Sequence, residues 1–217
     1  MWSIRSPLCA ILLVSVSWIP YIYGHGMMLV PSGRASRWRF NDSAPVNYND
    51  MEAFCGGLTN TWKKHGGKCG ICGDDYGMPT PRPHELGGEF GEGHVVATYP
   101  PGGQIPISVK LIANHRGYFV FDVCNLDREP ETEECFKRLK LSDGNDQYDL
   151  RYFRPSTFNM TVQVPHNLNC EHCVLRWHYK SANMWGTCEN GTSTLGCGPQ
   201  EIYRSCADIS VKRQTHW

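Results

Sequence analysis

The chain has 217 residues, 41% of them hydrophobic and 19% charged, and its 21 basic side chains balance its 21 acidic ones. A chain this close to neutral has no long-range field to attract nucleic acid or anionic lipid, so we expect neither a nucleic acid nor a membrane as partner. The length fits one domain, and 22 glycines, 14 prolines and 12% aromatic residues are typical of an all-β unit with long loops.

The N-terminus has the layout of a secretory signal peptide. One early charge, Arg5, is followed by an apolar run and then by the small residue Gly24. The apolar run is shorter than the roughly 20 residues that span a bilayer. We therefore expect residues 1–24 to be removed and residues 25–217 to form a single secreted, extracellular, monomeric domain. Cleavage a few residues away from Gly24 is the main alternative.

Eleven cysteines point to an oxidising compartment. Cys9 lies in the expected signal peptide, which leaves an even set: Cys55, Cys69, Cys72, Cys124, Cys135, Cys170, Cys173, Cys188, Cys197 and Cys206. An even set in a secreted chain predicts five disulfides, whose pairing the sequence leaves open. A zinc ribbon built from the pair Cys69 and Cys72 and the pair Cys170 and Cys173 is disfavoured, because the two pairs lie much further apart in the sequence than the roughly 15–20 residues of a ribbon.

Several segments alternate between apolar and polar residues, as strands with one buried face do. The clearest expected strand runs from Ile105 to His115, and the others cover residues 118–124, 158–164, 174–179 and 202–211. A short strand is expected after residue 25, and residues 55–93 read as a long disulfide-tied loop region. Short strands without a convincing amphipathic helix predict an all-β, immunoglobulin/fibronectin III-like β-sandwich.

His25 is the residue around which a metal site can be predicted. Cleavage after Gly24 would make His25 the first residue, whose α-amine and ring Nδ1 can bind one metal together. The expected strand pattern puts His115 at a hairpin tip, on the same face as Ala113, and points Tyr203 toward the core. Copper(II) has the highest affinity in the divalent series and favours a tetragonal set of nitrogens. His25, His115 and Tyr203 are therefore candidate ligands of a copper ion.

Each of these residues also has an ordinary structural interpretation. His115 alone would be a hairpin histidine with surface hydrogen bonds, and Tyr203 alone a core tyrosine whose hydroxyl is paired. The remaining histidines lie in loops or beside polar residues, and solvated or supporting roles are expected for them: His65, His84, His94, His166, His172, His178 and His216. Three glycosylation sequons, at Asn41, Asn159 and Asn190, are expected at the surface of a glycoprotein.

Several segments taken together resemble a known family. They are the junction at His25-Gly26, the glycine- and cysteine-rich segments at 55–57 and 67–74, the stretch 113–119 and the closing stretch 198–209. Over essentially the whole mature chain these segments are similar to lytic polysaccharide monooxygenases of auxiliary-activity family fifteen, the invertebrate type. The resemblance implies an immunoglobulin-like sandwich that carries one copper ion on a flat face.

The same resemblance implies roles for individual residues. His25 and His115 match the copper-binding histidine brace, Tyr203 matches the axial aromatic position, and Ala113 matches the small residue that shapes access to the open side. The implied catalytic residues are therefore His25, His115 and Tyr203.

The implied activity is that of an oxidoreductase that cleaves β-1,4-linked insoluble polysaccharide. An external reductant and oxygen or hydrogen peroxide are the implied co-substrates. A carbon of the glycosidic bond loses a hydrogen and is hydroxylated, after which the bond breaks by elimination. Members active on chitin and members that also attack cellulose are known, and chitin with C1 oxidation is the activity we expect here.

Two alternatives come from other functional classes. The first is a non-catalytic chitin-binding or copper-binding secreted protein with the same fold, since an aromatic flat face would serve binding as well as cleavage. The second is a disulfide-rich structural matrix protein, which would need neither the free His25 amine nor copper.

Overall fold

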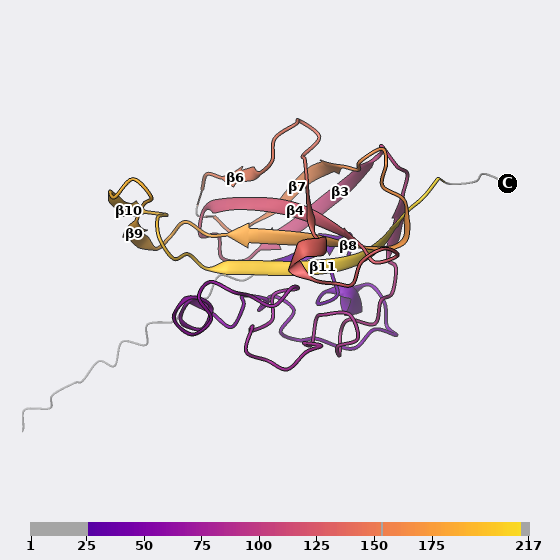
Figure 1. Cartoon of the computed structure of the whole chain (residues 1–217), viewed down its shortest axis with the longest axis horizontal. Helices are drawn as coiled ribbons and strands as arrows, with labels where there is room; N and C mark the ends of the chain where they lie inside the picture. The colour runs from indigo at the N-terminus through magenta and orange to yellow at the C-terminus, as the bar shows by residue number, and fades with distance from the viewer. Residues whose placement is uncertain (1–25, 153, 214–217) are drawn as a thin grey trace, which may run out of the picture.

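The computed structural model describes residues 26–152 and 154–213, which form two packed β-sheets and a separate hairpin (Figure 1). The strands are β1 (Gly26–Val30), β2 (Ala97–Tyr99), β3 (Gln104–Leu111), β4 (Gly117–Asn125), β5 (Lys137–Leu139), β6 (Tyr148–Leu150), β7 (Ser156–Gln163), β8 (Cys170–Lys180), β9 (Trp185–Thr187), β10 (Ser193–Leu195) and β11 (Ile202–Val211). The predicted β-sandwich is confirmed.

The smaller sheet has the strand order β1-β3-β7, and the larger has the order β2-β11-β8-β4-β5, with β6 also paired to β4. β2 runs parallel to β11, while the other pairs are antiparallel. β9 and β10 pair only with each other. This hairpin extends beyond the end of the sandwich at the left of Figure 1.

The core lies between the facing sides of the two sheets. Ile105, Ile107, Val109 and Leu111 alternate along β3 and are each at most 2% exposed, as the sequence pattern predicts. They pack in one cluster with aromatic side chains of the larger sheet: Phe119, Phe121, Trp177, Tyr179 and Tyr203.

The strand expected from Ile105 to His115 is shorter than predicted, because β3 ends at Leu111. β3 and β4 belong to different sheets, so the prediction that His115 lies at the tip of a hairpin is wrong. Asn114 is buried and its side-chain oxygen accepts a hydrogen bond from the Arg116 backbone N–H at 2.9 Å. Arg116 has a φ of 56°, a left-handed conformation that turns the chain. Strand parity therefore does not extend to Ala113, and the prediction that Ala113 and His115 lie on the same face of a strand loses its basis.

A layer of irregular chain between β1 and β2 covers the outer face of β11, where the indigo-to-purple ribbon lies beneath that strand in Figure 1. The predicted five disulfides are confirmed, and Cys72–Cys206 joins this layer to β11. Both faces of β11 are consequently buried, including Asp208, which is 3% exposed.

Helical structure in the described chain is short: the 3-10 turns η1 (Arg37–Arg39) and η3 (Glu133–Cys135) and the π-helical segment η2 (Thr59–Lys64). Within residues 26–152 and 154–213, no helix has the length and apolar character needed to cross a membrane.

Candidate metal centre

The residues of the candidate site meet at one end of the sandwich. β8 pairs with both β4 and β11, and its Tyr179 lies opposite Phe119 on one side and Tyr203 on the other. His115 lies in the turn that leads into β4, two residues before the strand begins. β11 begins at Ile202, so Tyr203 lies at the same end of the larger sheet.

The backbone of His115 is held on both sides. Its N–H donates to the Tyr179 hydroxyl at 2.9 Å, and its carbonyl accepts the Ala182 N–H at 2.9 Å. Burial raises the pKa of Tyr179 well above its ordinary value, despite the hydrogen bond from His115, so this hydroxyl stays protonated and neutral. The turn that carries His115 is therefore fixed to the larger sheet.

Glu201 connects the two predicted site residues in this part of the chain. One oxygen of its carboxylate lies 3.0 Å from Nδ1 of His115 and accepts the Tyr203 hydroxyl at 3.1 Å. An ionised carboxylate only accepts, so Nδ1 carries the proton of this contact, and in a neutral imidazole Nε2 is then the nitrogen with a lone pair for a metal. Histidine ligands of metals usually have this kind of partner on the other ring nitrogen.

Glu201 was not among the site residues predicted from the sequence. The available signal was its position two residues before Tyr203, which places both on the same side of an extended chain. What the pattern lacked was any indication that His115, far away in the sequence, would approach the same carboxylate.

Tyr203 points into the core, as predicted, and is 1% exposed. Its ring stacks on Tyr179 with centroids 5.3 Å apart and packs against Phe54 at 6.5 Å. Its hydroxyl is already bonded to Glu201, which makes it at most a weak metal ligand. The ring therefore fills the buried side of the site.

The side chains of this site fit a copper ion. The imidazole of His115 is half-buried, and its contact with the Glu201 carboxylate through Nδ1 leaves Nε2 as the nitrogen that could bind a metal. His25, the other predicted ligand, lies outside the described residues. Ala113 is half-buried in the turn before His115.

Other titratable side chains behave mainly as structural partners. His84 lies 2.7 Å from the Asp74 carboxylate, His172 2.8 Å from Asp208, and His65 3.3 Å from Asp75. The supporting roles expected for these three histidines agree with these contacts.

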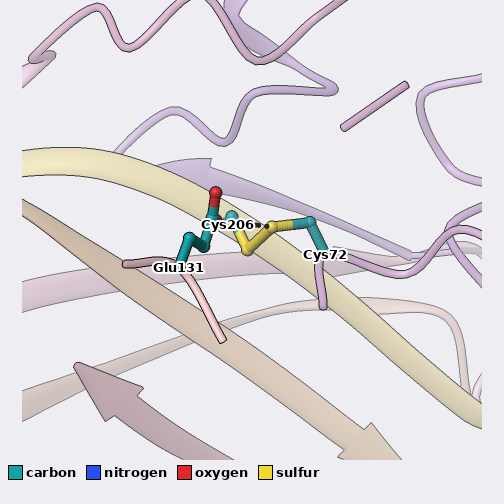
Figure 2. A group of neighbouring side chains, drawn as sticks. All are labelled: Cys72, Glu131 and Cys206. Carbon is teal, nitrogen blue, oxygen red and sulfur yellow. Dashed lines mark hydrogen bonds between the residues drawn. A yellow bond between two sulfur atoms is a disulfide. The ribbon is translucent and has the colours of Figure 1, made fainter. Parts of the chain in front are cut away.

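A second group of possible metal ligands, Cys72, Glu131 and Cys206, lies on the other side of β11 (Figure 2). The two sulfurs are joined in a disulfide and are not thiolates, the form in which cysteine binds metals. Glu131 is engaged by Arg34 at 2.8 Å. This group is a buried structural contact between the loop layer and β11.

Comparison with known proteins agrees with the geometry. The sequence profile of the family described as "Lytic polysaccharide mono-oxygenase, cellulose-degrading" matches residues 25–209. The chain belongs to this family. A solved structure of the lytic polysaccharide monooxygenase AA15 from Thermobia domestica, in the Cu(I) state, is 41% identical with a TM-score of 0.83, covering 87% of this chain and 99% of that chain. No curated protein matches significantly.

Membership of the family makes this chain a copper-dependent lytic polysaccharide monooxygenase. Such an enzyme uses one copper ion, an external reductant, and oxygen or hydrogen peroxide. The family acts on insoluble polysaccharide and is generally extracellular. These properties agree with the reaction class and cofactor expected from the sequence.

Proposed function

We propose that the mature enzyme is a single secreted domain that begins at His25 after removal of residues 1–24. Two observations support this start. The family match begins at residue 25, and β1 begins at Gly26, opposite Leu111 at the end of β3. Leu111 is the last residue of β3 and lies four residues before His115 in the chain.

In this proposal the α-amine and ring Nδ1 of His25 and Nε2 of His115 would hold the copper ion. Bound there, the metal would supply one-electron redox chemistry for activating the oxygen co-substrate. Glu201 fixes the ring of His115, Tyr203 closes the buried side, and Ala113 limits bulk next to the open side. The single observation that carries the proposal is the contact of Glu201 with both His115 and Tyr203.

We further propose that chitin is the substrate and that C1 is the oxidised carbon, with the enzyme acting as a monomer. Because the matching family is described as cellulose-degrading, the test needs two arms. Copper-loaded protein is incubated with ascorbate and either chitin or cellulose, and the released oligosaccharides are analysed by mass spectrometry. Aldonic acid ends from chitin support the proposal, whereas release from cellulose alone or oxidation only at C4 contradicts it.

A further inference from the structure

A cavity of about 850 Å³ lies beside the turn that carries His115. Its lining comes from Asn114 in that turn, from the chain between β5 and β7, and from Ser156 and Phe158 in β7. β6, which lies within this part of the chain, is at the upper left of Figure 1. The volume lies within the roughly 300–1,000 Å³ typical of small-molecule sites. None of the described residues assigned to the copper site lines this cavity.

Strand register places the cavity next to the proposed copper ligand. Leu150, at the end of β6, pairs with Gly117 at the start of β4, and Ser156, at the start of β7, pairs with Leu111 at the end of β3. The connection from β6 to β7 therefore starts and ends beside the two strands that hold the His115 turn.

Hydrogen-bond acceptors in the cavity are oriented by local hydrogen bonds. Asp143 accepts from the backbone and side-chain amide of Asn145 at 3.0 and 2.9 Å, and Asp149 accepts from the side chain of Gln147 at 2.8 Å. Acceptors that are already oriented lose little freedom when a ligand binds.

Donors come from Arg151 and Arg154, both exposed, whose guanidinium groups have no hydrogen bond or ion pair to any other residue that the structure describes. Together with Asp143 and Asp149 they give the lining two positive and two negative charges. A lining with balanced charge favours a neutral ligand rich in hydroxyl groups over an anion.

Aromatic rings provide an apolar surface in the same cavity. Tyr148 is half-buried and stacks on Phe119 with centroids 6.1 Å apart, so its position is fixed by the core. Tyr152 is 75% exposed, so its ring does not pack in the core. A pyranose ring has an apolar face and polar edges, and this combination of tyrosines, carboxylates and guanidinium groups suits both.

We propose that this cavity is a glycan subsite, which takes a pyranose unit of a neutral β-1,4-linked chain whose scissile bond lies at His115. It rests on the proposed function and deepens it, because a sugar unit held beside Asn114 would set which glycosidic bond reaches the metal. Tyr152, Arg151 and Arg154 would then determine specificity without contacting the metal.

Binding of soluble glycans to metal-free protein tests the subsite separately from catalysis. The probe is the trimer of β-1,4-linked N-acetylglucosamine, followed by titration calorimetry and by amide chemical shifts. We expect shifts in residues 141–152 and near Asn114, and affinity about tenfold weaker in Tyr152→Ala and in the double variant Arg151→Ala/Arg154→Ala. Tyr48→Ala and Arg128→Ala, exposed residues that do not line this cavity, should bind as the unmodified protein does.

Three results would overturn the subsite: no binding of the trimer at millimolar concentration, equal affinity in all variants, or shifts confined to other parts of the surface. Tighter binding of the trimer of β-1,4-linked mannuronate would show an anion site instead and would also overturn it. Oxidised products from chitin without trimer binding would leave the proposed function intact and remove only the subsite. Binding of the trimer without oxidised products would support the subsite and contradict the proposed function.

Discussion

Among single residues that the structure describes, His115 should matter most for the copper site. His115→Ala removes one of three proposed nitrogens while the core and the disulfides remain, so cleavage should be lost and the melting temperature should change little. Mass spectrometry of products and a thermal melt check both parts. Oxidative activity retained by a folded His115→Ala protein would move the second ligand elsewhere, to His94 first.

Glu201 should act through His115 rather than on the substrate. Removing a carboxylate that orients a metal-binding histidine usually lowers metal affinity or activity by about 10–100-fold. We expect a loss of that size in copper affinity for Glu201→Ala, and a smaller loss for Glu201→Gln, which retains an acceptor oxygen. Titration with copper measures both. Equal affinities in Glu201→Ala and the unmodified protein would show that the contact at 3.0 Å does not orient the ligand.

Two substitutions at Tyr203 distinguish a role of its side chain at the metal from a role in the core. Tyr203→Phe keeps the ring and removes only a hydroxyl bonded to Glu201, so fold and copper binding should persist with a modest change in the copper spectrum. Tyr203→Ala opens a cavity at a residue 1% exposed and should destabilise by about 3–5 kcal/mol, by analogy with Phe→Ala. An electron paramagnetic resonance spectrum unchanged in folded Tyr203→Ala would remove Tyr203 from the site.

The lowered pKa of His178 should make the free energy of unfolding depend on pH. Burial and the neighbouring cations of Arg204, Arg176, Arg138 and Lys180 lower its pKa well below 6.5, and its Nδ1 accepts a hydrogen bond from Arg204 at 3.3 Å. As the pH falls below 6.5, the unfolded chain takes up a proton that the folded chain does not, so the free energy of unfolding decreases. Thermal melts between pH 7 and 5 should show this decrease, and His178→Gln should flatten it. The same pH dependence in both proteins would assign it to other groups.

At the scale of elements, apolar alternation predicted the long strands and failed where burial gives no pattern. β11 has the predicted bounds, because its alternate residues face the core. β9 and β10 are three residues each with almost no burial, so the pattern contained nothing to detect. The early end of β3 depends on a hydrogen bond of Asn114, and the role of Glu201 on a long-range contact, neither of which periodicity encodes.

The β9–β10 hairpin should be the least independently stable element. Its two strands pair only with each other, and a two-stranded hairpin is marginal in water. The disulfide Cys188–Cys197 and the buried Gln200, bonded to Met184 and Cys197, hold its base. Replacing both cysteines with serine should raise hydrogen exchange in residues 185–195 and leave β4 and β8 protected. Unchanged exchange in that hairpin would mean that Gln200 alone suffices.

At the scale of the whole molecule, the loop layer and the larger sheet depend on one buried charge cluster. Arg34 binds Asp208 at 2.7 Å and Glu131 at 2.8 Å with almost no solvent exposure. Burial alone would raise the pKa of Asp208, but hydrogen bonds from Arg34 and His172 outweigh burial and lower it. Asp208 lies in the second half of β11, whereas Tyr203 lies near its start, so the cluster joins the loop layer to the sheet and contacts none of the described site residues.

The proposed copper site depends above all on the free amine of His25 acting together with His115. Copper titration calorimetry can compare two forms of the protein, one starting at His25 and one with an additional residue before it. The form starting at His25 should bind one copper ion tightly, and the extended form should bind it more weakly by orders of magnitude. Equal affinity in the two forms would show that the free amine of His25 is not a copper ligand.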